Sequence, residues 1–255
     1  MRIKVLGCAG AEYPGSNSPA FLIDNEILLD AGTITSALGW KGQMRIRTIF
    51  ITHAHLDHIR SIPFLADNIV MTDTAHRVTI YSIPSVIRTM RRNLFNSAVW
   101  PDFTVIPHPD DAILTLLKAE EGRPVRAGKY LVTPFRVSHT VPSVGYLVED
   151  GKGRTVFYTG DTGPTNGTWK RIGKRKIHCL IIDVSFPNAL EELAIRTGHM
   201  TPSLLRAELA KMANQPDRVY VTHPKPRHRR TIEAQIRKMG MGRVRLLREG
   251  ETIRI

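Results

Sequence analysis

Four side chains that can bind a metal ion lie within a run of six residues. They are His53, His55, Asp57 and His58. With the histidine and aspartate content of this chain, such a pattern arises by chance roughly once in a thousand sequences, so incidental surface histidines are a poor explanation. Imidazole nitrogens and carboxylate oxygens are common ligands of divalent metals. The run therefore predicts a metal site.

The secondary structure expected around this run divides the four ligands into two pairs. The apolar residues 46–51 predict a strand, and an extended segment that continues from it places His53 and His55 on the same side. Residues 57–66 predict a helix, on which the other two ligands diverge by about 100°. One ion cannot easily collect all four side chains. We therefore expect two adjacent metals, one for each pair, with further ligands from distant parts of the chain.

This motif resembles the metallo-β-lactamase superfamily, whose members usually hold two zinc ions, and sometimes manganese or iron, at the edge of an αββα sandwich. The resemblance implies an α/β fold with four layers in the order αββα. It also implies two divalent metal ions per chain, with zinc as the first expectation and manganese or iron as alternatives.

Three further ligands are implied by the resemblance, each at the end of a predicted strand. The strands cover residues 130–138, 155–158 and 218–222, and the ligands are His139, Asp161 and His223. In the superfamily pattern His139 completes the site of the first two histidines, His223 joins the second pair, and Asp161 bridges both metals. Taken alone, each could be an ordinary loop residue.

The other predicted elements alternate between strands and helices. Further strands are expected at residues 2–7, 20–23, 26–29, 78–81, 144–149, 179–183 and 244–247, the last of which would close the sandwich. Helices are expected at residues 84–95, 188–197 and 201–212, the last with Thr201 as N-cap, and one more ends near Gly240. Asp30 follows one of the early strands. It is either a turn residue or a carboxylate that supports a ligand histidine from beneath, as an Asp-x-Gly does in the superfamily.

Length and composition predict one domain, residues 1–255, because 42% of the residues are hydrophobic and no Pro/Ser-rich linker divides the chain. The two cysteines, Cys8 and Cys179, exclude a disulfide framework and favour a reducing compartment. No window approaches 18 consecutive apolar residues, so we expect a cytoplasmic protein without a membrane span. The net charge of +13 favours an anionic partner, a phosphate ester or a nucleic acid, or is simply a basic solvated surface.

A second set of motifs is similar to one branch of the superfamily, the class II cyclic nucleotide phosphodiesterases. One is the stretch at residues 94–103, which ends in Trp-Pro-Asp-Phe. Within this stretch Trp100 could stack on a purine, whereas Phe95 and Phe103 are expected to pack into the core and anchor the long loop that contains them. Two other motifs begin at Asp183 and Gly198, and a closing motif spans residues 222–225. Asp183 occupies a position that is glutamate in this family. Because the aspartate side chain is shorter, the sequence leaves open how closely Asp183 approaches His199.

The phosphodiesterase resemblance implies roles for residues beyond the metal ligands. The catalytic residues are His199, Asp183 and Asp57, and the substrate-binding residues are Trp100, Lys225 and Arg227. His199 would protonate the departing 3′-oxygen, since the start of the next helix disfavours the charged form of a nearby imidazole. The alternative is that His199 only caps that helix. Four histidines match no motif and are expected to be structural or exposed, namely His76, His108, His178 and His228.

Two metals about 3.5–4 Å apart can hold a bridging hydroxide and polarise a phosphoryl oxygen. We therefore expect a dimetal phosphodiesterase that hydrolyses cyclic AMP or cyclic GMP to the 5′-monophosphate. The alternative is an RNA 3′-processing endonuclease similar to ribonuclease Z, and a nucleic-acid-binding module with a structural metal is a third reading. Antibiotic hydrolysis is not expected, because Asp161 occupies the bridging position that is a cysteine in one major group of secreted zinc β-lactamases. The expected partners are a cyclic nucleotide, RNA as second choice, and a second copy of the chain in a homodimer, but no membrane.

Overall fold

Short apolar runs rich in valine, isoleucine and leucine form the strands of two seven-stranded sheets. The computed structural model describes residues 1–255. The strand order of the first sheet is β14-β1-β2-β3-β4-β5-β6. Its strands are β1 (Arg2–Gly7), β2 (Ala20–Ile23), β3 (Ile27–Leu29), β4 (Thr48–Phe50), β5 (Val78–Ser82), β6 (Leu114–Lys118) and β14 (Thr252–Arg254).

The second sheet has the order β13-β12-β11-β10-β9-β8-β7. Its strands are β7 (Val125–Ala127), β8 (Tyr130–Arg136), β9 (Val144–Asp150), β10 (Thr155–Tyr158), β11 (Cys179–Asp183), β12 (Arg218–Thr222) and β13 (Val244–Leu246). Strands β10 to β13 run parallel. Because the carboxyl ends of parallel strands meet at one edge of a sheet, the loops after β10, β11 and β12 lie next to one another.

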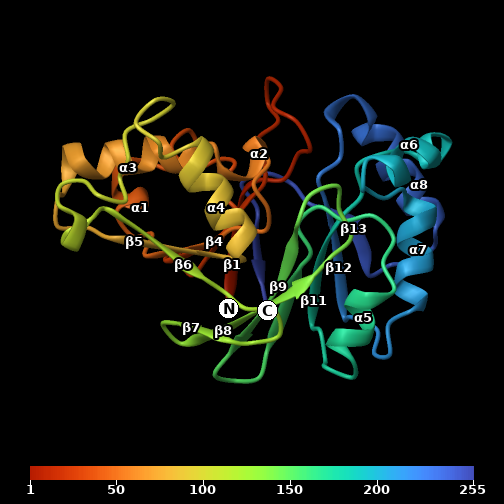
Figure 1. Cartoon of the computed structure of the whole chain (residues 1–255). Helices are drawn as coiled ribbons and strands as arrows, with labels where there is room; N and C mark the ends of the chain where they lie inside the picture. Colours follow the sequence, from red (N-terminus) through yellow and green to blue (C-terminus); the bar gives the residue numbers. More distant parts are fainter.

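The two sheets pack face to face and helices cover their outer faces (Figure 1). On the first sheet lie α1 (Trp40–Gln43), α3 (Ser61–Thr72) and α4 (Pro84–Asn93), and on the second lie α5 (Gly167–Ile172), α6 (Glu191–Arg196), α7 (Pro202–Ala210) and α8 (Arg229–Lys238). The short helix α2 (Leu56–Ile59) lies between the two halves. Three 3₁₀ turns occur at Pro109–Asp111, Asn188–Leu190 and Pro226–His228. The predicted αββα sandwich is confirmed.

The core between the sheets is built from side chains that point inward from both. Aromatic rings meet there, with Phe21 and Tyr158 4.8 Å apart and Phe50 and Tyr146 5.3 Å apart between ring centroids. A second buried layer lies between the second sheet and its helices. In β11, Ile181 faces the core between the sheets, and its neighbours Leu180 and Ile182 face the helices. Strands buried on both faces need apolar residues throughout, which explains their continuous apolar runs.

Two predicted helices differ from the observed ones. Residues 57–66 form the end of α2 and the start of α3 instead of one helix, because the backbone N–H of Ser61 donates to Ala31 O at 3.0 Å rather than to a carbonyl of its own helix. Residues 188–197 begin as a 3₁₀ turn and become helical only at Glu191. The predicted N-cap Thr201 is confirmed, since its side chain accepts a hydrogen bond from Leu204 N.

The sequence prediction was also wrong about which strand comes last. After β13 the chain continues into β14, which pairs antiparallel with β1 and forms the edge of the first sheet. Strands β6 and β7 and helices α1 and α5 were not predicted at all. All are short, between three and six residues, so their sequences carry little periodicity. None of the helices is both long and apolar enough to cross a membrane.

Candidate metal centre

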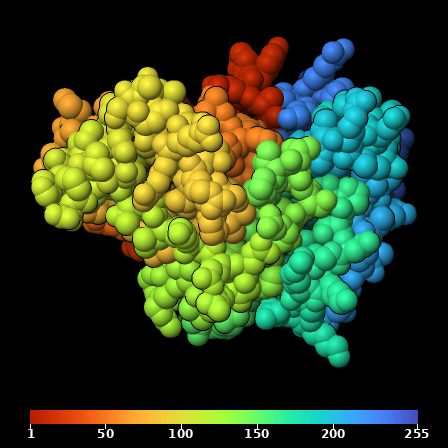
Figure 2. Space-filling view, in the orientation of Figure 1, coloured from red at the N-terminus to blue at the C-terminus, as the bar shows by residue number.

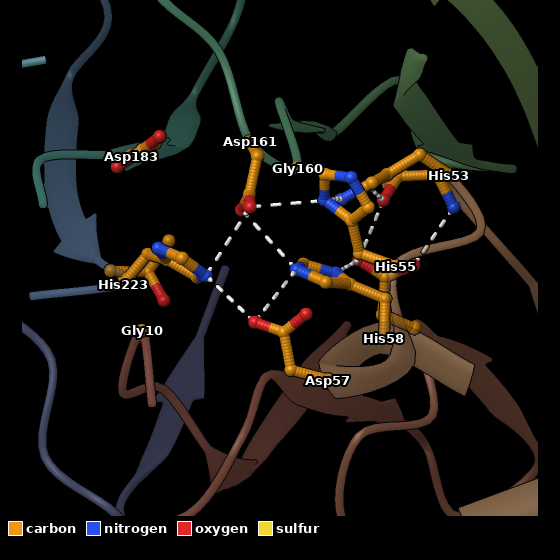
Figure 3. A network of polar contacts seen from close by, with 12 residues as sticks. Gly10, His53, His55, Asp57, His58, Gly160, Asp161, Asp183 and His223 are labelled. Atoms are coloured by element: carbon orange, nitrogen blue, oxygen red, sulfur yellow. Dashed lines mark hydrogen bonds and ion pairs between the residues drawn. The ribbon is translucent and has the colours of Figure 1, made fainter. Parts of the chain in front are cut away.

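The seven side chains expected to bind metal come from four loops, and all four loops reach the same edge of the sandwich. The loop after β4 and the start of α2 carry His53, His55, Asp57 and His58, and the loops after β8, β10 and β12 carry His139, Asp161 and His223 respectively. Most of them are visible in Figure 3, where they point toward one another. The structure therefore brings together residues up to 170 positions apart.

One cluster consists of three histidines and an aspartate. His55 Nδ1 lies 3.0 Å from His53 Nε2 and 3.2 Å from His139 Nε2. The Oδ2 atom of Asp161 lies 3.7 Å from His53 Nε2 and 3.9 Å from His139 Nε2. These ligand atoms all lie within 4.8 Å of one another, which is the geometry that a single cation needs.

A second cluster shares Asp161 with the first. The Oδ1 atom of Asp161 lies 3.3 Å from His58 Nε2, and its Oδ2 atom lies 3.3 Å from His223 Nε2. Asp57 Oδ2 completes the group, 3.3 Å from His223 Nε2 and 3.8 Å from His58 Nε2 (Figure 3). Because Asp161 belongs to both clusters, its carboxylate occupies the position of a bridge between two ions.

In four of the five ligand histidines, all except His55, the remaining ring nitrogen fixes the direction of the ligand nitrogen. His58 Nδ1 donates to Asp30 Oδ2 at 2.7 Å, and His139 Nδ1 donates to Gly198 O at 2.8 Å. His53 Nδ1 and His223 Nδ1 donate to the hydroxyls of Thr52, at 3.0 Å, and Ser185, at 2.8 Å. These hydroxyls accept because each gives its own proton to a carboxylate. The Nε2 lone pairs of all four rings are thus directed into the site.

Asp30 supports the site from beneath and is not a simple turn residue. Its fully buried carboxylate accepts hydrogen bonds from Thr52 N, Thr52 Oγ1, His58 Nδ1 and Tyr158 OH, at 2.7–2.9 Å. The sequence left open whether Asp30 had this role. Neither Thr52 nor Tyr158 was singled out in the sequence, because a threonine at a strand end and a tyrosine in an apolar strand are ordinary there.

The charges of the ligand groups are not all those of the metal-bound state. Burial lowers the pKa of His58, but the carboxylates of Asp161 and Asp30 outweigh burial and raise it well above its usual range, so metal binding must displace a proton from this ring. Burial lowers the pKa of His53, of His55 and of His139, so these rings are neutral and their lone pairs are free. Burial opposes ionisation of the two aspartates, but the neighbouring histidines outweigh it and lower the pKa of Asp161 well below its usual range and that of Asp57 to about 2. The imidazole and carboxylate ligands therefore suit divalent ions.

A buried polar atom without a well-aligned partner points to the same conclusion. His58 Nε2 is buried and makes no well-aligned hydrogen bond, although Asp161 Oδ1 lies 3.3 Å away and its other nitrogen is bonded to Asp30. Leaving such an atom unsatisfied costs about 1–3 kcal/mol, so native structures rarely tolerate it without a ligand. The residues present fit a pair of divalent cations.

His199 and Asp183 lie directly beside the second cluster. His199 Nδ1 donates to Asp183 Oδ2 at 2.6 Å, so the shorter aspartate does reach its partner. Asp183 is itself fully buried and also accepts from Ser185 Oγ at 2.7 Å. His199 Nε2 makes no hydrogen bond within the protein, and the ligand atoms of His199, Asp183, Asp161 and His223 lie within 4.8 Å of one another.

The structure excludes the alternative role of His199 and reverses one expectation about its charge. It does not cap helix α7, because Thr201 does. The start of that helix was expected to disfavour the charged imidazole, but the net effect of the surroundings is the opposite. Burial lowers the pKa of His199, yet the adjacent Asp183 carboxylate outweighs burial and raises the pKa above its usual range.

The three predicted substrate-binding residues have different surroundings. Trp100 packs against the core and contacts Phe64 with ring centroids 5.1 Å apart, and the structure does not bring it to the two clusters. Lys225 and Arg227 line a cavity of about 600 Å³ close to His199. Their roles in binding a substrate stay predictions.

Of the four histidines that matched no motif, three have the structural or exposed positions expected. His76 donates to Ile46 O at 2.8 Å, His178 accepts from Thr155 N at 3.1 Å, and the His108 side chain is 70% exposed. The fourth, His228, lies in the same cavity as Arg227.

Gly10 is a site residue that the sequence reasoning missed. A Cβ atom at position 10 would lie 2.6 Å from His223 Nδ1 and 2.4 Å from His223 O, too close for any other residue. The backbone of His223 is itself left-handed, with φ +66°. The tight approach of these two segments holds the ring of His223 in place, and a contact between residues so far apart in the sequence leaves no local signal.

We expect Asp30→Asn to weaken metal binding about 10- to 100-fold, the usual effect of removing a carboxylate that orients a ligand histidine. The amide cannot accept all four hydrogen bonds that Asp30 now receives. Metal titration by isothermal calorimetry measures the effect. Tyr158→Phe is the matched control, because it removes one of the four bonds and leaves the carboxylate. An Asp30→Asn variant that binds metal as tightly as the parent would contradict this role.

Comparisons with known proteins agree with this fold. Residues 25–224 match the family model described as beta-lactamase superfamily domain. The chain is 28% identical over 191 residues to a probable 3′,5′-cyclic-nucleotide phosphodiesterase from Yersinia pestis, a match that covers 68% of this chain and 53% of that protein. It is 29% identical over 157 residues to a ribonuclease Z from Metallosphaera sedula, covering 59% and 49%. The matched segments span about half of each relative.

Among solved structures, unliganded yeast PDE1 superposes with a TM-score of 0.86, covering 100% of this chain and 99% of that one at 19% sequence identity. At this identity the likeness concerns the fold alone.

Proposed function

Because this chain belongs to the β-lactamase superfamily, whose domain model matches residues 25–224, we propose that it is a metal-dependent phosphodiesterase that hydrolyses 3′,5′-cyclic nucleotides to 5′-monophosphates. The observation that carries the proposal is the position of the Asp183–His199 pair next to the shared carboxylate of Asp161. A site with two cation positions and an adjacent oriented imidazole has the parts that phosphodiester hydrolysis requires.

His53, His55, His139 and Asp161 would hold the first ion, and Asp57, His58, His223 and Asp161 would hold the second. When bound, a pair of divalent ions supplies a nucleophile at neutral pH and polarises the phosphoryl oxygen. Zinc is the ion we propose, since imidazole and carboxylate ligands suit it, although manganese and iron accept similar ligands. Asp57, whose side chain is 31% exposed, has in this proposal an additional role in orienting the nucleophile.

His199 holds the proton that the leaving group needs. Its Nδ1–H is committed to Asp183, so only Nε2 can donate to a substrate atom. A ribose 3′-alkoxide is a strong base and leaves poorly without a proton, which makes a donor at this position effective. Asp183 fixes the ring orientation and stabilises its protonated form, and Ser185 ties Asp183 to the metal ligand His223.

Cleavage of RNA, as in the ribonuclease Z relatives, is the second candidate, and one feature favours it. Helix α4 presents Arg88, Arg91 and Arg92 to solvent without acidic partners, around an open hollow of about 850 Å³. Ser85 and Thr89 belong both to this hollow and to a smaller one, of about 270 Å³, that reaches His55. A phosphodiester chain could follow these arginines to the metals.

Metal-loaded protein incubated separately with cyclic AMP, cyclic GMP and a precursor tRNA tests the two candidates. We expect release of 5′-monophosphates from the cyclic nucleotides. Replacing the three α4 arginines by alanine should leave this activity unchanged, because a single cyclic phosphate does not reach them. Cleavage of precursor tRNA that is lost in the α4 variant would favour the endonuclease instead. In that case the affinity for the tRNA should fall steeply with salt, by about 0.7 in log affinity per log salt for each phosphate contacted.

Several finer points stay proposals. They are zinc as the metal in the cell, a single domain for residues 1–255, a cytoplasmic location and a homodimer. None of them is needed for the chemistry proposed above.

A further inference from the structure

A cavity of about 600 Å³ lies between two segments from opposite ends of the chain. It is lined by Ala11, Glu12, Tyr13, Ser16, Phe186, Lys225, Pro226, Arg227 and His228, and we call it the Tyr13 cavity. Figure 2 shows the N-terminal loop, in red, and a C-terminal segment, in blue, projecting side by side from the top of the molecule with a hollow between them. The volume is in the range of small-molecule sites.

The Tyr13 cavity adjoins the proposed proton donor. The ring of Phe186 forms part of its wall and contacts both His199 and His228, with ring centroids 5.9 Å and 6.5 Å apart. Lys225, another wall residue, is held by a hydrogen bond from its ammonium group to Gly10 O at 2.5 Å. A ligand whose phosphate lies at the metals and whose leaving oxygen faces His199 can therefore extend into this cavity.

Tyr13 is an exposed aromatic residue on a constrained loop. Its side chain is 66% exposed. Tyr13 and Ser16 exchange two backbone hydrogen bonds, of 3.1 and 2.7 Å, around a turn whose Gly15 has φ +76° and whose Pro14 is fixed at the preceding position. The Tyr13 ring therefore does not serve to fill the core, and the turn holds this ring at the rim of the cavity.

The ends of this loop are fixed to the body of the protein. Glu12 forms an ion pair with Arg60, at the junction of α2 and α3. Asn17 is bonded through its backbone N–H and its side-chain amide to Glu249, at 2.5 and 2.8 Å. A ring carried on an anchored turn loses little conformational entropy when it contacts a ligand, which favours binding.

We propose that the Tyr13 cavity is the nucleobase subsite of this enzyme and that Tyr13 stacks on the base. The proposal rests on the proposed function, because that function places the phosphate at the metals. Two aromatic residues from separate segments line the cavity and suit a flat heteroaromatic ring, since such rings stack favourably with tyrosine and phenylalanine. Ser16, Arg227 and His228 supply hydrogen-bonding groups for the edge of the base.

Calorimetric titration of the metal-loaded protein with 5′-AMP and with ribose 5-phosphate tests the proposal, because the two ligands differ only by the base. We expect 5′-AMP to bind roughly 5- to 150-fold more tightly, the usual range for stacking on one base. In Tyr13→Ala most of this difference should disappear while the affinity for ribose 5-phosphate stays the same. Tyr13→Phe should retain the difference, because the Tyr13 hydroxyl has no hydrogen-bond partner.

Trp40→Ala is a second control, since Trp40 is 59% exposed but lies on α1, outside the cavity. Equal affinities of the parent protein for the two ligands would overturn the proposal, as would a Tyr13→Ala variant that still discriminates between them. Binding is measured without turnover, so the two proposals can fail separately. Discrimination without hydrolysis of cyclic nucleotides would support the subsite and contradict the function, and hydrolysis without discrimination would do the reverse.

Discussion

Asp161→Ala is expected to lower the metal content from two ions per chain to one or fewer and to lower turnover of every phosphodiester steeply. Asp161 is the only side chain whose carboxylate lies in both metal clusters, 3.7 Å from His53 Nε2 in the first and 3.3 Å from His58 Nε2 in the second. The metals contribute several kcal/mol to stabilisation of the transition state, so turnover should fall on the order of 10³-fold or more. Elemental analysis after saturation with metal and dialysis gives the stoichiometry, and bis-nitrophenyl phosphate reports turnover.

Asp57→Asn is the matched control, because Asp57 belongs to the second cluster alone. This variant should keep one tightly bound ion and lose the other. The circular dichroism spectrum checks that both variants fold. An Asp161→Ala protein that folds and still holds two ions would show that Asp161 does not bridge them.

His199→Ala is expected to slow hydrolysis of a cyclic nucleotide by about 10²–10⁴-fold, the usual contribution of general acid catalysis. Turnover of bis-nitrophenyl phosphate should be largely kept, because nitrophenolate leaves without a proton. The ring of His199 lies 5.2 Å from the rings of both His139 and His223, so the metal content of the variant must be measured as well. It should be unchanged.

Asp183→Asn should show the same pattern more weakly, because it weakens the orientation of His199 without deleting the imidazole. If both substrates suffer equally in His199→Ala at full metal content, His199 is not the acid and has a structural or substrate-binding role. A pattern in which only the cyclic nucleotide is affected distinguishes the proton donor from a residue that merely supports the metals.

The sequence predicted well those parts of the site whose residues are close together or lie in recognisable motifs. His53 to His58 show a spacing that few other functions require, and the motif at Gly198 predicts a role for His199, which the structure places in contact with Asp183. Such motifs can be recognised in a sequence because several ligands come from the same loop. The order of the strands then brings the remaining ligands to the same edge.

Contacts made across the fold were beyond what the sequence could predict. Asp30 reaches His58 and Tyr158, and Gly10 touches His223, only because distant strands pack together. The predicted direction of the pKa shift of His199 was wrong for the same reason, because burial and the nearby Asp183 carboxylate determine that shift. Strand β14 was missed because three residues give no periodic pattern, and it is stabilised by pairing with β1 at the other end of the chain.

The identity of the product tests most directly whether the protein is a dimetal cyclic nucleotide phosphodiesterase. Metal-loaded protein is incubated with cyclic AMP in water enriched in ¹⁸O, and the product is analysed by chromatography and mass spectrometry. The expected product is 5′-AMP with one ¹⁸O atom in its phosphate, formed only with metal present, because water attacks phosphorus and the 3′-oxygen leaves with a proton from His199. Unreacted cyclic AMP and cyclic GMP at full metal content, or 3′-AMP as the product, would contradict this function.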